Sequence, residues 1–138
     1  MNQNWFLLAT IVIFIHGCGN NTEQTNQAAK ISILTPLDSK TYNSPVNIKF
    51  GIENFLLAPA GTFAAGSGHH HLLVNTELPP MDRPIPTDEN HLHFGKAQTE
   101  TSLELPQGTH TLQLVLGDGS HIPHNPPIIS ERITIKVE

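Results

Sequence analysis

The sequence is poor in the residues that characterise several large classes of protein. It contains one cysteine in 138 residues, so no internal disulfide can hold the domain together and its core must do so. Only 7 residues are Lys or Arg, they form no cluster, and the formal net charge is −5, which argues against nucleic acid as a partner. The apolar run at residues 5–15, WFLLATIVIFI, is too short to cross a bilayer as a helix.

This apolar run predicts an export signal, and the single cysteine follows it closely. The segment Ile15-His16-Gly17-Cys18 resembles a bacterial lipoprotein processing site, with a small residue before the cysteine. We therefore expect a signal peptide at residues 1–17, then a lipidated Cys18 and a flexible tether over residues 18–30. The lipid would anchor the protein to a membrane in the cell envelope, as an outer-membrane lipoprotein. The alternative is an ordinary cleaved leader and a soluble periplasmic protein.

Residues 31–138 are long enough for one domain and too short for two. The 11 Pro, the 10 Gly and the short runs of Val, Ile, Leu and Thr favour strands and turns, and no helical period of any length is present. We expect an all-β fold, an immunoglobulin-like two-sheet sandwich of about 6–8 short strands. The strands are expected at residues 30–34, 46–53, 69–75, 91–94, 101–105, 109–117 and 128–137.

Histidine is the abundant residue that stands out, with nine in the chain, eight of them between positions 69 and 124. The segment GSGHHHLLVN is expected to contain a strand, and side chains on a strand alternate between two faces. His70 then shares an apolar face with Leu72 and Val74, whereas His69 and His71 point the opposite way. The segment HLHF places His91 and His93 on one face in the same manner.

Two histidines at positions i and i+2 of a strand project from one face about 6–7 Å apart, and a neutral imidazole nitrogen is a good ligand for transition metals. The predicted ligands of a metal ion are His69, His71, His93 and His121, with His91, His124 and His110 as secondary candidates. A nitrogen-rich site without cysteine favours zinc or copper(II), and nickel less, over copper(I). Three loop carboxylates could orient the histidines: Asp82, Asp88 and Glu89.

Two other interpretations remain open. The histidines could only brace loops by hydrogen bonds to backbone carbonyls, in a structural or interaction module of the envelope, and this role suits His70 and His110 best. The protein could also be a metal-dependent enzyme acting on envelope material. No HExxH, CxxC or GxSxG motif is present, so we assign no catalytic residue, and Ser67 beside His69 lacks the context of a nucleophile.

The segments PLDSKTYNSPVNIKFGIENF, GSGHHHLLVN, HLHFGKAQTETSLELPQGTHTLQLVLGD and HIPHNPPIIS together resemble the bacterial family called domain of unknown function 4399, over about residues 33–137. The resemblance implies an exported protein without an assigned activity. At two of the compared positions this chain differs, because Asn75 stands where relatives tend to have Asp and Ala97 where Gly is common. The positions that match the family pattern are Gly68, His69, His70, His71, His93, Gly95, Gln98, Thr99, His110, Asp118, His121 and His124.

Overall fold

The computed structural model describes residues 27–138, and this part of the chain consists of nine β-strands joined by turns and loops, without a helix. The predicted leader, Cys18 and most of the tether lie outside the described residues, and those interpretations stay predictions. The strands are β1 (Lys30–Thr35), β2 (Thr41–Tyr42), β3 (Val46–Glu53), β4 (Leu56–Leu57), β5 (Ser67–Val74), β6 (His91–His93), β7 (Glu100–Leu103), β8 (Gly108–Gly117) and β9 (Ile133–Val137).

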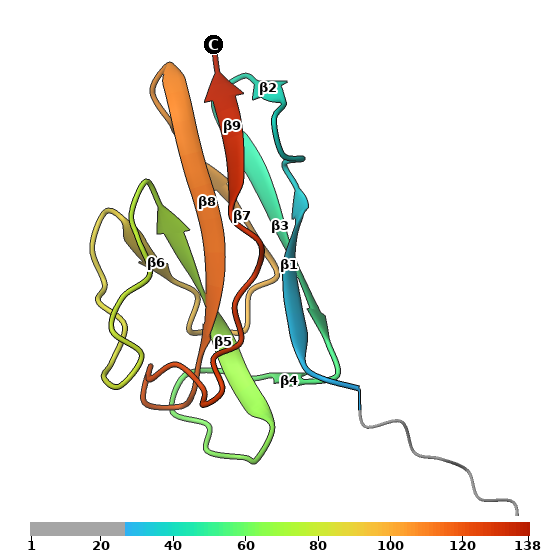
Figure 1. Cartoon of the computed structure of the whole chain (residues 1–138), viewed down its shortest axis with the longest axis vertical. Coiled ribbons are helices and arrows are strands. Elements are labelled where there is room, and N and C mark those ends of the chain that lie inside the picture. The colour runs from blue at the N-terminus through green and yellow to red at the C-terminus, as the bar shows by residue number, and fades with distance from the viewer. Residues whose placement is uncertain (1–26) are drawn as a thin grey trace, which may run out of the picture.

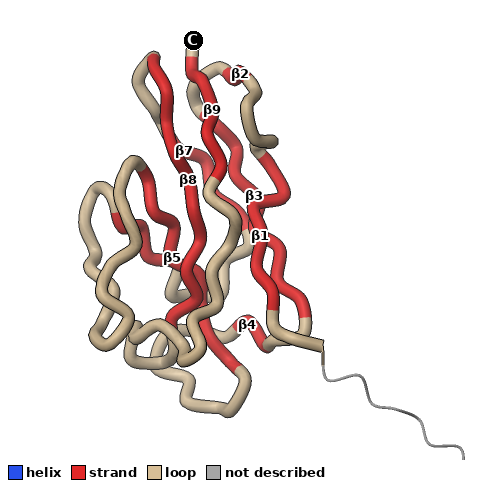
Figure 2. The backbone as a smooth tube through the Cα atoms, viewed as in Figure 1, coloured by secondary structure: helices blue, strands red, loops and turns tan. Residues whose placement is uncertain are grey.

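The strands form two sheets that face each other, which confirms the predicted all-β sandwich (Figures 1 and 2). The smaller sheet has the order β1-β3-β7, and both of its pairings are antiparallel. The larger sheet has the order β2-β9-β8-β5-β4, and β6 also pairs with β5. On its free side β5 therefore meets two short strands, parallel β4 at its start and antiparallel β6 near its end.

The core lies between the two sheets and consists of the alternate residues that face inward. In β3 the inward residues Val46, Ile48 and Phe50 are buried, as the period-2 pattern predicts. The alternate residues Asn47 and Lys49 are exposed. They pack against Leu72, Val74 and other buried residues of the larger sheet. Since the chain has no disulfide among the described residues, this apolar contact supplies most of the stability of the domain.

Most strand ends lie within two residues of the sequence-based expectation, but the regions described next differ more. The last strand was expected at residues 128–137 but begins at Ile133. Ile129 makes only an isolated bridge to Val115, because the prolines at 126 and 127 cannot donate backbone hydrogen bonds and the chain passes this point as a loop. The segment expected to be a loop at residues 54–68 contains the short strand β4 and the first two residues of β5.

Two loops cover the outer face of the larger sheet next to β5. Ile85 of the loop between β5 and β6 packs on Leu73 and Val115 and forms a second small apolar cluster. The loop after β8 lies beside it, since the backbone N–H of Ile85 donates to the carbonyl oxygen of His121 over 2.9 Å. As a result all eight residues of β5 are buried, on both faces of the strand.

Candidate metal centre

The alternation predicted for β5 is present, and it gives the three consecutive histidines two different environments. His70 faces the core, where its ring lies 5.2 Å from the ring of Phe50, centroid to centroid, and neither ring nitrogen has a hydrogen-bond partner. His69 and His71 face the outer side of the sheet. Their side chains are nevertheless fully buried, because the loops described above cover them.

The pairing of β5 with β6 brings a third histidine to the outer side. His71 lies directly opposite His93 in the antiparallel register, and directly opposed side chains have Cβ atoms about 4.5–5.5 Å apart. The ring centroid of His93 is 5.1 Å from that of His71 and 5.0 Å from that of His69. Strand pairing therefore fixes three imidazoles at one place.

A fourth ring, that of His121, reaches the same place from the loop after β8. Its centroid lies 5.0 Å from that of His69, 5.8 Å from that of His71 and 4.7 Å from that of His93. The backbone of His121 has a φ of 67°, in the left-handed region that non-glycine residues seldom adopt. We call His69, His71, His93 and His121 the histidine cluster.

Two glycines give the rings of the cluster the space that they occupy. A Cβ atom added at Gly117 would lie 3.0 Å from Nε2 of His71 and 3.3 Å from the Cα atom of His121. A Cβ atom at Gly95 would collide with the imidazole ring of His93. Any larger residue at either position would displace a ring of the cluster.

Three members of the cluster offer ring nitrogens close enough together for one metal ion. One nitrogen from each of His69, His71 and His93 lies within 4.8 Å of the other two, and the Nε2 atoms of His69 and His71 are 3.1 Å apart. In a tetrahedral zinc site with Zn–N bonds of 2.0–2.1 Å, two ligand nitrogens are about 3.3–3.4 Å apart. The Nε2 atoms of His69 and His71 already have nearly this spacing.

Burial keeps these rings neutral. Burial, followed by the neighbouring imidazoles, lowers the pKa of His71 to about 3. The same causes lower the pKa of His69 to about 4, although the carboxylate of Asp118 acts in the opposite direction. The pKa of His93 is also lowered, first by burial and then by His121. Since a metal ligand must be an unprotonated nitrogen, His69, His71 and His93 are in a suitable state at neutral pH.

The three secondary candidates lie apart from the cluster. His91 donates from Nδ1 to Asp88 Oδ1 over 2.8 Å. The Nε2–H of His110 donates to the carbonyl of Pro106 over 2.8 Å and its Nδ1 accepts from the Asn75 amide over 2.9 Å, so this buried ring is fully hydrogen-bonded. His124 packs edge-on against Phe55.

Two of the three loop carboxylates that the sequence offered for orienting histidines have other partners. Asp82 forms an ion pair with the neighbouring Arg83, and Asp88 binds His91 outside the cluster. Asp118 was named from the sequence only as a position of the family pattern. It holds the turn that carries His121, as its Oδ1 accepts from the backbone N–H groups of Ser120 and Ile122. The hydroxyl of Ser67 donates to the carbonyl of Ala64 over 2.6 Å.

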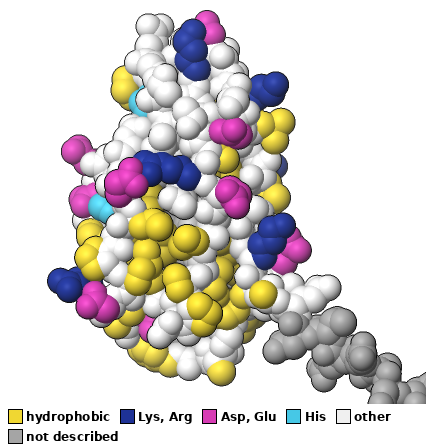
Figure 3. Space-filling view, in the orientation of Figure 1, with side chains coloured by type: hydrophobic (Ala, Val, Ile, Leu, Met, Phe, Trp, Pro, Cys, Tyr) yellow, Lys and Arg dark blue, Asp and Glu magenta, His cyan; other side chains and the backbone are white. Residues whose placement is uncertain are grey.

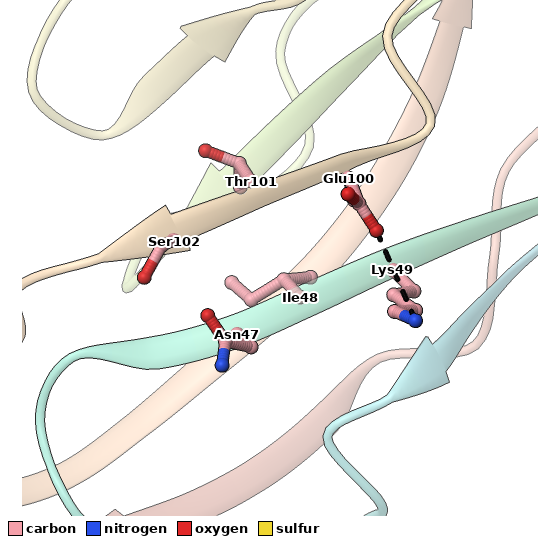
Figure 4. Close-up of a pocket in the computed structure, with 6 residues that line it drawn as sticks. All are labelled: Asn47, Ile48, Lys49, Glu100, Thr101 and Ser102. Atoms are coloured by element: carbon pink, nitrogen blue, oxygen red, sulfur yellow. Dashed lines mark ion pairs between the residues drawn. The ribbon is translucent and has the colours of Figure 1, made fainter.

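Apolar side chains gather on the lower half of the face shown in Figure 3, and only small areas of histidine are visible there. A hollow of about 500 Å³ is lined by residues of the paired strands β3 and β7, with the Lys49–Glu100 ion pair at 3.9 Å on its wall (Figure 4). Within residues 27–138, no helix is long and apolar enough to cross a membrane.

Comparison with known proteins identifies a family and no further relative. Residues 48–138 match the family described as "Domain of unknown function (DUF4399)". The matched range contains all eight histidines of the described chain and the strands from β4 to β9, together with most of β3. Searches of curated proteins and of solved structures found no match.

Proposed function

The chain belongs to the DUF4399 family, and we propose that its histidine cluster binds one divalent transition-metal ion. His69, His71 and His93 would be three of the ligands, and His121 would be the fourth. Bound there, the ion would cross-link β5, β6 and the loop after β8. This arrangement suits the buffering, delivery or structural use of an ion in the cell envelope, where the predicted leader would direct the protein.

One observation carries the proposal, namely that two strands and a loop bring four imidazole rings to one place. The Nε2 atoms of His69 and His71 are 3.1 Å apart, and a ring nitrogen of His93 lies within 4.8 Å of a ring nitrogen of each. Nε2 of His93 is buried and has no partner among the described residues, at a cost of about 1–3 kcal/mol that a bound ion would offset. In His110, by contrast, each ring nitrogen has a hydrogen-bond partner, as is usual for a histidine that only stabilises a fold.

The ligand atoms, which are imidazole nitrogens, also limit which metal ions the cluster could bind. Imidazole nitrogen suits zinc, copper(II) and nickel, whereas magnesium and calcium prefer oxygen ligands. No cysteine occurs in the folded part of the sequence to favour copper(I). Zinc and copper are therefore the ions that we propose first, followed by nickel.

Isothermal titration of the untagged, chelator-treated protein with Zn²⁺, Cu²⁺ and Ni²⁺ tests the proposal. We expect one site with a Kd of about 1 µM or lower, because three imidazole ligands are already close together. The triple variant His69→Ala/His71→Ala/His93→Ala should lose this site. His91→Ala is the matched control, since it removes a histidine of the same strand β6 that lies outside the cluster, and it should bind as the wild type does.

Absence of any ion binding tighter than about 100 µM would contradict the proposal and favour the structural module. Equal binding by the wild type and the triple variant would also contradict it, since the ion would then bind elsewhere. To separate loss of ligands from loss of fold, the circular dichroism spectrum and the Tm of each metal-free variant should be compared with those of the wild type.

A further inference from the structure

A metal ion in this cluster would bring two positive charges into a place lined by imidazole rings. Burying a charge without a compensating partner is costly, so buried metal sites commonly include a carboxylate close to their histidines. Asp82 is paired with Arg83, and Asp88 is paired with His91 outside the cluster. Asp118 is placed differently, because it follows Gly117, which pairs with His69 across β5 and β8.

We infer that Asp118 is the positioning residue of the metal site, holding the turn that presents His121 and placing a negative charge beside His69. The inference rests on the proposed function and extends it, because it names the residue that sets how strongly the histidine cluster holds an ion. Two separate effects of the same carboxylate support it.

The first effect is on the geometry of the turn. Asp118 Oδ1 accepts from the backbone N–H of Ser120 over 2.8 Å and from that of Ile122 over 2.9 Å. Two backbone hydrogen bonds close the same turn. The N–H of Asp118 donates to the carbonyl of Ile122, and the N–H of His121 donates to the carbonyl of Asp118, both over 2.9 Å. These bonds hold His121 at its φ of 67°, a conformation that costs about 1 kcal/mol or more for a non-glycine residue.

The second effect is electrostatic. Asp118 directly follows Gly117, and Gly117 lies opposite His69 in the pairing of β5 with β8. The carboxylate is therefore close to the cluster in the fold, and its negative charge attracts a cation bound there.

Two substitutions separate these effects. Asp118→Asn keeps a side-chain oxygen that can accept from Ser120 and Ile122 but removes the charge. Asp118→Ala removes the charge and the two hydrogen bonds. Asp88→Asn is the matched control, because it removes a carboxylate that binds a histidine of β6 outside the cluster.

The experiment is a competition titration of Zn²⁺ between a chelator and the untagged protein, together with the visible absorption of the Co²⁺ form. We expect the Kd for Zn²⁺ to rise about 10-fold in Asp118→Asn, the lower end of the effect seen when a carboxylate beside metal-bound histidines is removed. The Co²⁺ bands and the metal-free Tm of this variant should stay as in the wild type. Asp118→Ala should bind more weakly still and change the Co²⁺ bands, because His121 loses its position.

The outcomes distinguish the two proposals. If the wild type and Asp118→Asn bind Zn²⁺ with the same Kd, the role of Asp118 is wrong, but the metal site itself is supported. Wild-type protein that binds no ion overturns the metal site and the role of Asp118 with it. A 10-fold loss in Asp88→Asn as well would overturn the specific role, since any nearby carboxylate would then have the same effect.

Discussion

The two faces of β5 bury histidines in opposite ways. On the core face, His70 is a single ring among apolar side chains and lies against Phe50. On the outer face, His69 and His71 lie against two further imidazoles from β6 and the loop after β8. All three rings are equally inaccessible to solvent, so burial does not distinguish a candidate ligand from a histidine of the core. A candidate ligand is distinguished by ring nitrogens of other histidines that lie close to its own.

His110 supplies a third case for this comparison. It is buried too, and each of its ring nitrogens has a partner, one in Asn75 and one in the carbonyl of Pro106. The chain thus contains a buried histidine that is hydrogen-bonded, one that is isolated in the core, and a group of four that face one another. The following substitutions act on these environments separately.

The largest effect on stability is expected on the core face. Leu72 is fully buried between the sheets, and Leu72→Ala should lower the free energy of unfolding by about 2–5 kcal/mol, through lost apolar contact and the cavity left behind. Because its side chain points away from the histidine cluster, the rise in Tm produced by saturating Zn²⁺ should remain. Urea unfolding with and without Zn²⁺ measures both quantities. A loss of the Zn²⁺ effect in this variant would show that the two faces are not independent.

An intermediate effect is expected from His70, and it depends on pH. Burial lowers its pKa from 6.5 to about 4, so the unfolded chain binds a proton at a higher pH than the folded chain does. The free energy of unfolding that His70 contributes above pH 6.5 is therefore lost as the pH falls towards 4. Between pH 7 and pH 5 one such ring destabilises the domain by about 2 kcal/mol. His70→Leu should remove that part of the pH dependence and leave Zn²⁺ binding at pH 7 unchanged.

Urea unfolding of the metal-free wild type and of His70→Leu at pH 7 and at pH 5 is the measurement. If the two proteins lose the same free energy of unfolding over this range, His70 is not held neutral in the core. If the variant also loses the Zn²⁺ site, the separation of the two faces of β5 is wrong.

The smallest effect is expected at the hydrogen-bonded histidine. Asn75 binds His110 Nδ1 and also accepts from the N–H of Thr111 over 3.0 Å, at a φ of 55° that asparagine tolerates well. Asn75→Ala should therefore cost about 1 kcal/mol of stability and leave metal affinity unchanged. Asn75→Asp keeps an acceptor for Thr111 and should cost less. A loss above about 3 kcal/mol in Asn75→Ala would exceed what these hydrogen bonds explain.

Much of the fold could be predicted because the sheets follow local patterns. The alternation in VNIKFGIE and in HHHLLV fixes which side chains share a face, and the structure confirms both assignments. The same alternation separated His70 from its two neighbours before any tertiary contact was known. Short strands such as β2 and β4 were missed, since two residues carry no period and depend on pairing with a distant strand.

The candidate site was only partly predictable for a related reason. The sequence offered seven histidines without showing which would meet, since this depends on the register of β5 against β6 and on the turn at Asp118. His91 shares a face with His93, as predicted, but it lies opposite Leu73 in the ladder, and its ring binds Asp88 outside the cluster. The signal that could have found Asp118 was its position: an aspartate three residues before His121 can accept from the backbone of the turn that follows it.

The register of β6 has a consequence for how this domain could be studied as it folds. His71 and His93 meet because residue 71 lies opposite residue 93, and a slip of one residue would turn the side chain of His93 to the other face of the sheet. The proposed site would thus exist only in chains whose β5 and β6 have paired correctly. The visible absorption of bound Co²⁺ would then report the rate at which β5 and β6 pair. A stopped-flow refolding experiment can record it without a label on the protein.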